Sequence, residues 1–339
     1  MKRTFFVIAL LFSLYACCCM ANAKCVNVAV RDNEDVSAWM KFNTKKMNMY
    51  VDMLGLTADI LSDSDGKPEK DIADANKLIG FLIINNGKDI TNGRKLRFES
   101  TQLLYAYKKY INADVQMKNC DNARAYFDRI RNLFGKDYLV VDFIGPRLVD
   151  PVIDADIYKL EKVITERALL SELDLENVCF SAPEYDIWKQ KKADIVFVNM
   201  LWGKETSAFG YWEKKPKNGI ISAEGLIKAV NDGDGYKFNG GKAFSKDSSM
   251  ILSAYTAMAI AYDHKPSCKN SRMYLDKIKE FTSHDYQILF PITGEIFDPS
   301  EGDVYKEQKK CNLEEIKDSG VPANKCFTKD EYESLFIGK

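Results

Sequence analysis

Apolar residues recur along much of this chain at spacings of three and four, the period of a helix with one buried face. The clearest example covers residues 121–134. Asp121 suits an N-cap there, and Gly135 offers a stop after the last turn. The apolar positions between them are Ala123, Tyr126, Phe127, Ile130, Leu133 and Phe134. The pattern therefore predicts an amphipathic helix.

The same spacing predicts most of the remaining elements. Further helices are expected over 35–61, 69–86, 99–115 and 154–173. Residues 87–97 contain the turn dipeptide Asn92-Gly93 and are expected to form a loop or a short hairpin. The methionines at 40, 47, 49 and 53 are interpreted as ordinary core residues. The chain as a whole is predicted to be all-α.

The chain repeats itself. The pattern of residues 120–138 recurs at residues 268–286, which is 268 − 120 = 148 residues later. The match extends over 67–151, where 24 of 85 positions are identical to the residue 148 positions on. A repeat of this length predicts two tandemly duplicated helical lobes, residues 24–178 and 179–339.

Residues 1–23 have the pattern of a signal peptide. Lys2-Arg3 precedes an apolar run that is too short to span a membrane, and Ala21-Asn22-Ala23 fits a cleavage site. The alternative is Leu14-Tyr15-Ala16-Cys17, which resembles the lipobox of bacterial lipoproteins and would place a lipid on Cys17. The chain is therefore expected to be secreted, or held in the periplasm or cell envelope. A lipid anchor is the only attachment to a membrane that the sequence predicts.

The cysteine count predicts disulfides in an exported chain. Six cysteines remain after cleavage: Cys25, Cys120, Cys179, Cys268, Cys311 and Cys326. One scheme that respects the repeat pairs Cys25 with Cys120, Cys179 with Cys268 and Cys311 with Cys326. The other pairs Cys120 with Cys179 and Cys268 with Cys326, and leaves Cys25 with Cys311. The first scheme is favoured because it leaves no distant pair.

One part of each lobe resembles a known family. The helices 99–115 and 121–134 form a predicted antiparallel pair, and the second carries an Ala-x-x-Tyr-Phe pattern from Ala123 to Phe127. This pair resembles the helical hairpins of tetratricopeptide-type repeats, although the 34-residue period of those repeats is missing. The resemblance implies a binding scaffold.

Charge and motifs narrow the function further. The formal net charge is −1 and both signs are spread along the chain, so nucleic acid is not an expected partner. The sequence has no phosphate-binding loop, nucleophile elbow or zinc motif. Residues 63–66 and 232–235 begin like calcium loops but lack the later ligands, and they are interpreted as polar turns. Neither a metal nor a cofactor is expected.

Two features remain as candidates for binding. Trp202, Tyr211 and Trp212 lack counterparts in the first lobe and form the candidate surface for a partner. The dipeptide Asp137-Tyr138 recurs as Asp285-Tyr286, which would suit mirrored ligand contacts. The preferred interpretation is that each tyrosine ring packs and its hydroxyl caps a helix end.

These observations predict an exported, non-enzymatic α-helical scaffold that binds another protein or an envelope component. A carrier of an apolar ligand is one alternative. A hydrolase that uses carboxylates is another, although no spacing in the sequence identifies its two acids.

Overall fold

The computed structural model of the protein describes residues 44–61, 66–91, 94–142, 147–181, 183–211, 214–238, 241–291, 293–319 and 324–336. The predicted signal peptide, Cys17, Cys25 and Trp212 lie outside these residues. The first of the two calcium-like turns also lies outside them, except for Gly66.

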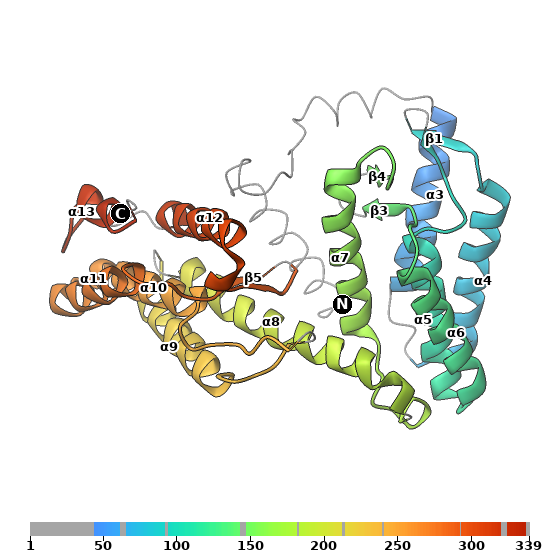
Figure 1. The fold of residues 1–339 in the computed structure, drawn as a ribbon. Helices are drawn as coiled ribbons and strands as arrows, with labels where there is room; N and C mark the ends of the chain where they lie inside the picture. The colour runs from blue at the N-terminus through green and yellow to red at the C-terminus, as the bar shows by residue number, and fades with distance from the viewer. Residues whose placement is uncertain are drawn as a thin grey trace. The chain divides into compact units, whose positions relative to one another are not determined.

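The described part of the chain is mostly helical, which confirms the predicted all-α class (Figure 1). Its strands pair only as short two-stranded antiparallel ribbons. By its internal contacts the chain divides into two compact units, which we call unit 1 (residues 1–189) and unit 2 (residues 190–339).

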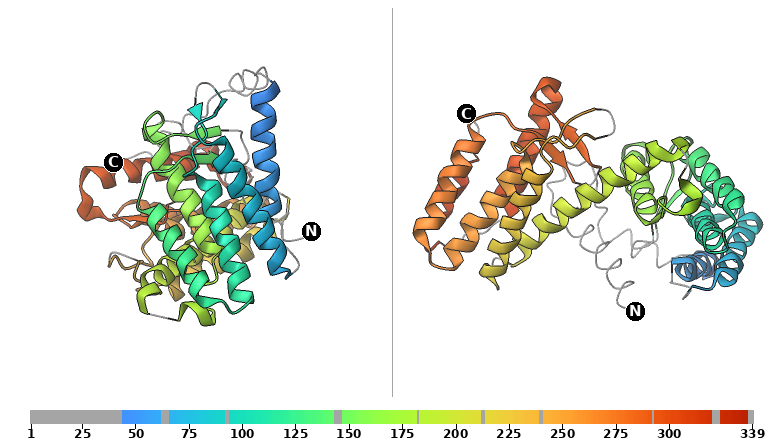
Figure 2. Two further views of the ribbon diagram at one scale, coloured as in Figure 1. Left: turned by 90° about the vertical axis from the view of Figure 1, so that its right-hand side faces the viewer. Right: turned by 90° about the horizontal axis from the view of Figure 1, so that it is seen from below.

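Among the described residues, five long helices lie wholly within unit 1, and α5 lies beside both α4 and α6 (Figure 2). A ribbon follows α4, which confirms the hairpin expected within 87–97, and a second ribbon follows α6. The elements are α3 (Thr44–Leu61), α4 (Pro68–Asn85), β1 (Asp89–Thr91), β2 (Arg94–Lys95), α5 (Thr101–Gln116), α6 (Cys120–Phe134), β3 (Val140–Asp142), β4 (Arg147–Val149) and α7 (Ala155–Glu172).

The chain then continues through two short 3-10 turns, η1 (Val178–Phe180) and η2 (Pro183–Tyr185), into the long helix α8. Helix α8 begins in unit 1 and continues into unit 2. The elements of the second half are α8 (Asp186–Tyr211), α9 (Pro216–Asp232), α10 (Ser249–His264), α11 (Cys268–Thr282), β5 (Ile288–Phe290), β6 (Glu295–Phe297), η3 (Pro299–Glu301), α12 (Asp303–Ser319) and α13 (Lys329–Ser334).

The boundary between the units falls after Lys189, later than the predicted lobe boundary at 178/179. Aromatic packing explains the difference. The Phe127 ring of α6 lies 5.3 Å from Phe180, 4.8 Å from Tyr185 and 5.6 Å from Trp188, measured between ring centroids. The segment after Cys179 therefore belongs to the core of unit 1.

Helix positions recur at the offset found in the sequence. The helices α4, α5, α6 and α7 begin 148 residues before α9, α10, α11 and α12, and β3 and β4 begin 148 residues before β5 and β6. Hydrogen bonds recur as well. The Thr101 N–H donates to the Leu139 carbonyl, and the Ser249 N–H donates to the Gln287 carbonyl. This is the pattern that a tandem duplication would produce.

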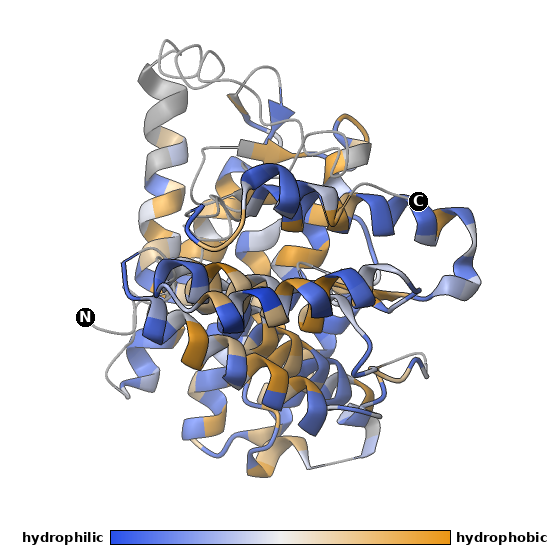
Figure 3. Ribbon diagram, turned by 90° about the vertical axis from the view of Figure 1, so that its left-hand side faces the viewer, coloured by the Kyte–Doolittle hydropathy of each residue, from blue (hydrophilic) through white to orange (hydrophobic). Residues whose placement is uncertain are grey.

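Helix α6 shows how sequence spacing becomes packing. Ala123, Phe127, Ile130 and Leu133 are buried, as the spacing predicts. The helix begins one residue earlier than predicted, with Asn119 rather than Asp121 at the N-cap position, and it ends at Phe134 before Gly135. Figure 3 shows the same alternation of hydrophobic and hydrophilic residues along many helices.

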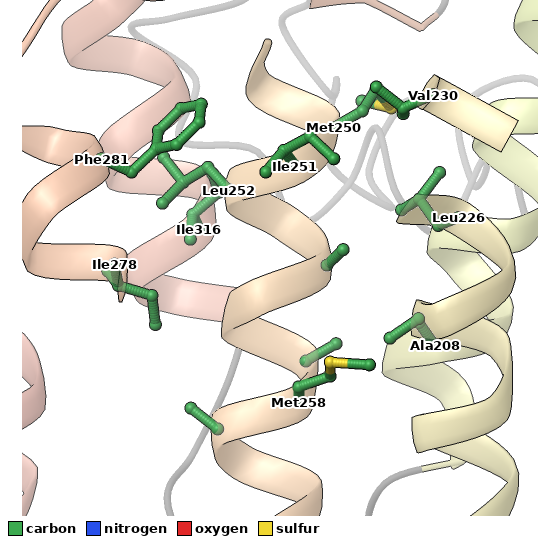
Figure 4. Close-up of a cluster of buried hydrophobic side chains, with 14 of the residues drawn as sticks. Ala208, Leu226, Val230, Met250, Ile251, Leu252, Met258, Ile278, Phe281 and Ile316 are labelled. Carbon is green, nitrogen blue, oxygen red and sulfur yellow. The ribbon is translucent and has the colours of Figure 1, made fainter. Parts of the chain in front are cut away.

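Helix α10 is the central helix of unit 2. It is buried along nearly its whole length, and its neighbours are α9 on one side and α11 on the other. Figure 4 shows Met258 pointing toward Ala208 of α8, whereas Leu252 points toward Phe281 and Ile316. A helix that is apolar on most sides is typical of such a position.

The disulfides correct the favoured cysteine scheme. Cys120 is bonded to Cys179 and Cys268 to Cys326, at sequence separations of 59 and 58. The pairings of Cys25 with Cys120, of Cys179 with Cys268 and of Cys311 with Cys326 were therefore wrong, because the segments that contain Cys179 and Cys326 fold back to the start of α6 and of α11. Cys311 is also disulfide-bonded. Its predicted partner, Cys25, lies outside the described residues, so that pairing stays a prediction.

Candidate functional site: a tyrosine and cation face in each unit

The structure does not bring the predicted aromatic surface together. Trp202 is half-buried and Tyr211 is exposed, and both lie on α8. They are 211 − 202 = 9 residues apart, which is about two and a half helical turns, so their side chains project from opposite sides of the helix. Trp212 lies outside the described residues. Trp202 and Tyr211 therefore cannot form one flat patch.

A different aromatic group lies between α5 and α6. The Tyr107 and Tyr126 ring centroids are 5.7 Å apart, and the Tyr110 ring stacks on Tyr126 at 4.3 Å. The Arg129 guanidinium lies over two of these rings, 4.9 Å from the Tyr126 centroid and 5.8 Å from that of Tyr107. Tyr107 and Tyr126 are half-buried and Arg129 is exposed. We call Tyr107, Tyr126 and Arg129 the unit 1 face.

Unit 2 carries the same group between α10 and α11. The Tyr255 and Tyr274 centroids are 5.9 Å apart, and the Lys277 ammonium lies 5.0 Å and 5.2 Å from them. These three residues follow the unit 1 face by 148 positions each, since 107 + 148 = 255, 126 + 148 = 274 and 129 + 148 = 277. We call them the unit 2 face.

A third stacked tyrosine completes each face, but it comes from a different position. In unit 1 it is Tyr110, three residues after Tyr107. In unit 2 it is Tyr262, seven residues after Tyr255, whose ring lies nearly parallel to Tyr274 at 5.8 Å. Spacings of three and seven both return to the same side of a helix. Each unit thus has three tyrosine rings and one cation, although the third ring comes from non-equivalent positions in the two units.

Tyr107, Tyr255 and Tyr274 remain neutral at physiological pH. Burial raises the pKa of Tyr107, and it raises the pKa of Tyr255 and Tyr274 as well. Their hydroxyls are therefore hydrogen-bond donors as well as acceptors. Each cation over a ring contributes about 0.5–1 kcal/mol at an exposed position. Each face thus offers aromatic surface, hydroxyl groups and one positive charge.

The recurring Asp-Tyr dipeptide is structural. The Tyr138 and Tyr286 rings are buried, as predicted, with the Lys162 and Lys309 ammonium groups each 5.3 Å from a ring centroid. The predicted helix-end cap is wrong. The Tyr138 hydroxyl lies 3.3 Å from Glu166 Oε1, in the middle of α7, because the ring points across the unit to that helix.

Unit 2 also holds an unusual carboxyl group. Glu205 of α8 lies on the buried side of the helix, near Ser253 of α10 and Glu315 of α12. Burial, together with the Glu315 charge, raises the pKa of Glu205 to about 7, and the Ser253 hydroxyl opposes this shift. Sequence spacing does not identify this pair, because its members are 315 − 205 = 110 residues apart.

The described residues contain no group of three or more His, Cys, Asp or Glu side chains that could hold a metal ion. Among the helices whose residues are described, none is both long enough and apolar enough to cross a membrane. Comparison with protein-family models, curated proteins and solved structures finds no match to this chain.

Proposed function

We propose that this chain is an exported, non-enzymatic scaffold whose unit 1 and unit 2 faces bind another protein or an envelope component. One observation carries the proposal. Two tyrosines and a cation recur at matching positions of both units, and at least part of each group is open to solvent. The tetratricopeptide-like helix pair, which implies a binding scaffold, is the element that presents the unit 1 face.

The chemistry of the faces suits protein recognition. Tyrosine and arginine are enriched in protein interfaces, where rigid rings supply contact area and a polar end. Arg129 and Lys277 would contact acidic or carbonyl groups of the partner, and the tyrosine hydroxyls would add hydrogen bonds. Two such faces on one chain would allow a repetitive partner to be held at two points, which strengthens binding without new contacts.

Export is part of the proposal. The pattern of residues 1–23 favours a cleaved signal peptide, with the lipid anchor on Cys17 as the alternative. The disulfides support an oxidising compartment, because reducing compartments seldom keep such bonds. The partner is accordingly expected outside the cytoplasm.

The test uses the exported chain, immobilised and exposed to the envelope and secreted fractions of its source cells. The variants Arg129→Ala and Lys277→Ala should each lower capture of a specific partner. Adding Tyr126→Ala and Tyr274→Ala should lower it by about tenfold or more, as expected for interface hot spots. Circular dichroism would confirm that the variants keep their helices.

The structure offers a matched control. Arg131 and Lys279 are also at equivalent positions, since 131 + 148 = 279, and they occupy the last turns of α6 and α11. Replacing both with alanine removes the same charge without touching the tyrosines, so capture should be unchanged. Equal capture by the face variants and this control would contradict the proposal.

A further inference from the structure

The outer side of α8 in unit 2 carries an uncharged stripe. Val196, Met200 and Tyr211 are 52%, 40% and 44% exposed, although all three are large and largely apolar. At 100° per residue they share one side of the helix with smaller residues. Those smaller residues are Ala193, Gly203, Ser207 and Gly210. The stripe is free of charge over 211 − 193 + 1 = 19 residues, a length of about 28 Å.

Helix α3 provides an internal comparison. By the 148-residue offset, α3 corresponds to residues 192–209 of α8, and the two helices bury the same positions. Tyr50, Met53 and Ile60 of α3 are buried, as are their counterparts Val198, Leu201 and Ala208. The fold therefore orients the two helices alike within their units, and their outer sides can be compared position by position.

The outer sides differ in charge. Asp52 and Asp59 are exposed on α3, and their counterparts on α8 are Met200 and Ser207, since 52 + 148 = 200 and 59 + 148 = 207. Gly55 and Gly203 are equivalent as well. The fold thus accepts acidic residues at these positions, so an apolar surface there is not required for folding. Exposed apolar stripes of this kind are typical of interaction sites.

The stripe is complementary to itself. If two α8 helices pack antiparallel about a two-fold axis between residues 201 and 202, position n faces position 403 − n. Met200 then faces Gly203, Val196 faces Ser207 and Ala193 faces Gly210. In each of these three pairs a larger side chain meets a smaller one, which is what close helix packing requires.

The described surroundings leave room for such packing. A Cβ atom added at Gly203 or Gly210 would meet nothing within 4 Å, so both sites are open to an incoming side chain. The Ser207 hydroxyl donates to the Gly203 carbonyl at 2.7 Å, so burial would not leave this hydroxyl unpaired. The same register brings the Lys192 ammonium of one copy beside the Tyr211 ring of the other, which is the arrangement of a cation–π contact.

We infer that the α8 stripe, residues 193–211, is the contact by which two copies of this chain associate as an antiparallel, two-fold symmetric pair. An isologous contact of this kind uses the same surface on both copies. The inference does not depend on the unit 1 and unit 2 faces.

The test measures the molar mass of the exported chain by sedimentation over a range of concentrations. The native chain should associate to a dimer. The variant Met200→Asp with Ser207→Asp gives α8 the residues that α3 carries at the same positions, so it should fold. It should weaken association on the order of a hundredfold, because it buries carboxylates in the contact opposite Gly203 and Val196, neither of which can pair with a negative charge.

Two controls define the outcome. Ile221 of α9 is 56% exposed, and Ile221→Asp adds a charge away from the stripe, so association should be unchanged. A short bis-maleimide should join two copies of Met200→Cys and fail to join two copies of Ile221→Cys. A native chain that stays monomeric at every concentration, or a dimer that persists unchanged with Met200→Asp and Ser207→Asp, would overturn the inference.

Discussion

The Lys109 ammonium lies 2.8 Å from the Asp71 carboxylate, and both side chains are nearly inaccessible to solvent, at 9% and 3% exposed. This ion pair joins α5 to α4 within unit 1. The positions 148 residues later in unit 2 are Ala257 and Gly219, so unit 2 forms without this ion pair.

Removing one partner of this ion pair should be much more harmful than removing both. Asp71→Ala leaves a buried ammonium without its carboxylate, and we expect it to lower the free energy of unfolding by about 3–5 kcal/mol. The double variant Asp71→Ala, Lys109→Ala resembles unit 2 and should recover most of that loss. Urea unfolding of the three proteins measures the difference. Additive losses in the double variant would show that the two charges do not act as a pair.

The disulfide pairing can be checked directly. Peptide mapping without reductant should recover Cys120 linked to Cys179 and Cys268 linked to Cys326. The remaining link should join Cys311 to Cys25. Replacing Cys120 and Cys179 together with alanine should lower the free energy of unfolding by about 2–4 kcal/mol. A peptide that links Cys179 to Cys268 would contradict the structure.

The carboxyl of Glu205 should make stability depend on pH. Because its pKa is raised from 4.5 to about 7 in the folded chain, the folded state holds an extra proton between those values. The contribution of Glu205 to stability is therefore most favourable below about pH 4.5, falls as the pH rises to about 7, and then stays constant. The total change is at most about 3 kcal/mol.

The variant Glu205→Gln isolates this effect. It should be more stable than the native chain at pH 8, and the difference should disappear near pH 4.5. Thr57, which occupies the equivalent position on α3, shows that the fold accepts a neutral residue there. Thermal unfolding of both proteins across this pH range provides the comparison. A constant difference at all pH values would rule out the titration of Glu205 as its cause.

We expect the Tyr158 hydroxyl to stabilise the folded chain through one buried hydrogen bond. It accepts a hydrogen bond from the buried Tyr138 N–H at 3.0 Å, and the Tyr305 hydroxyl accepts one from Tyr286 N–H at 3.1 Å in unit 2. Tyr158→Phe and Tyr305→Phe each leave a backbone donor unpaired, so each should lower the free energy of unfolding by about 1–3 kcal/mol. Denaturant unfolding tests this. Tyr211→Phe, at an exposed position, should have almost no effect, and an equal loss in all three variants would exclude this explanation.

Helical periodicity was enough to predict most elements of the fold, because one apolar face per helix leaves a clear pattern. The buried positions of α6 illustrate this. The cysteine pairing was not predictable from separations alone. It depends on how the chain turns after Cys179, where Phe180 and Tyr185 pack on Phe127, and such a tertiary contact has no local pattern.

The binding candidates show a different limit. The absence of first-lobe counterparts predicts a shared surface for Trp202 and Tyr211, but they lie on opposite sides of α8 because they are nine residues apart. The signal for the unit 1 and unit 2 faces was present in the repeat itself, since Tyr107 and Tyr126 are identical to Tyr255 and Tyr274. These tyrosines come into contact only because α5 packs against α6, and that packing is a tertiary contact. Retained residues were thus the better indicator of a shared surface.

The Cys120–Cys179 bond also affects how the chain would survive a protease. Val152 and Ile153, in the turn after β4, are 80% and 64% exposed and lie between the two bonded cysteines. A single nick there would leave the severed ends tethered through sulfur, so the clipped molecule would still travel as one piece on a gel until a thiol reagent released its fragments.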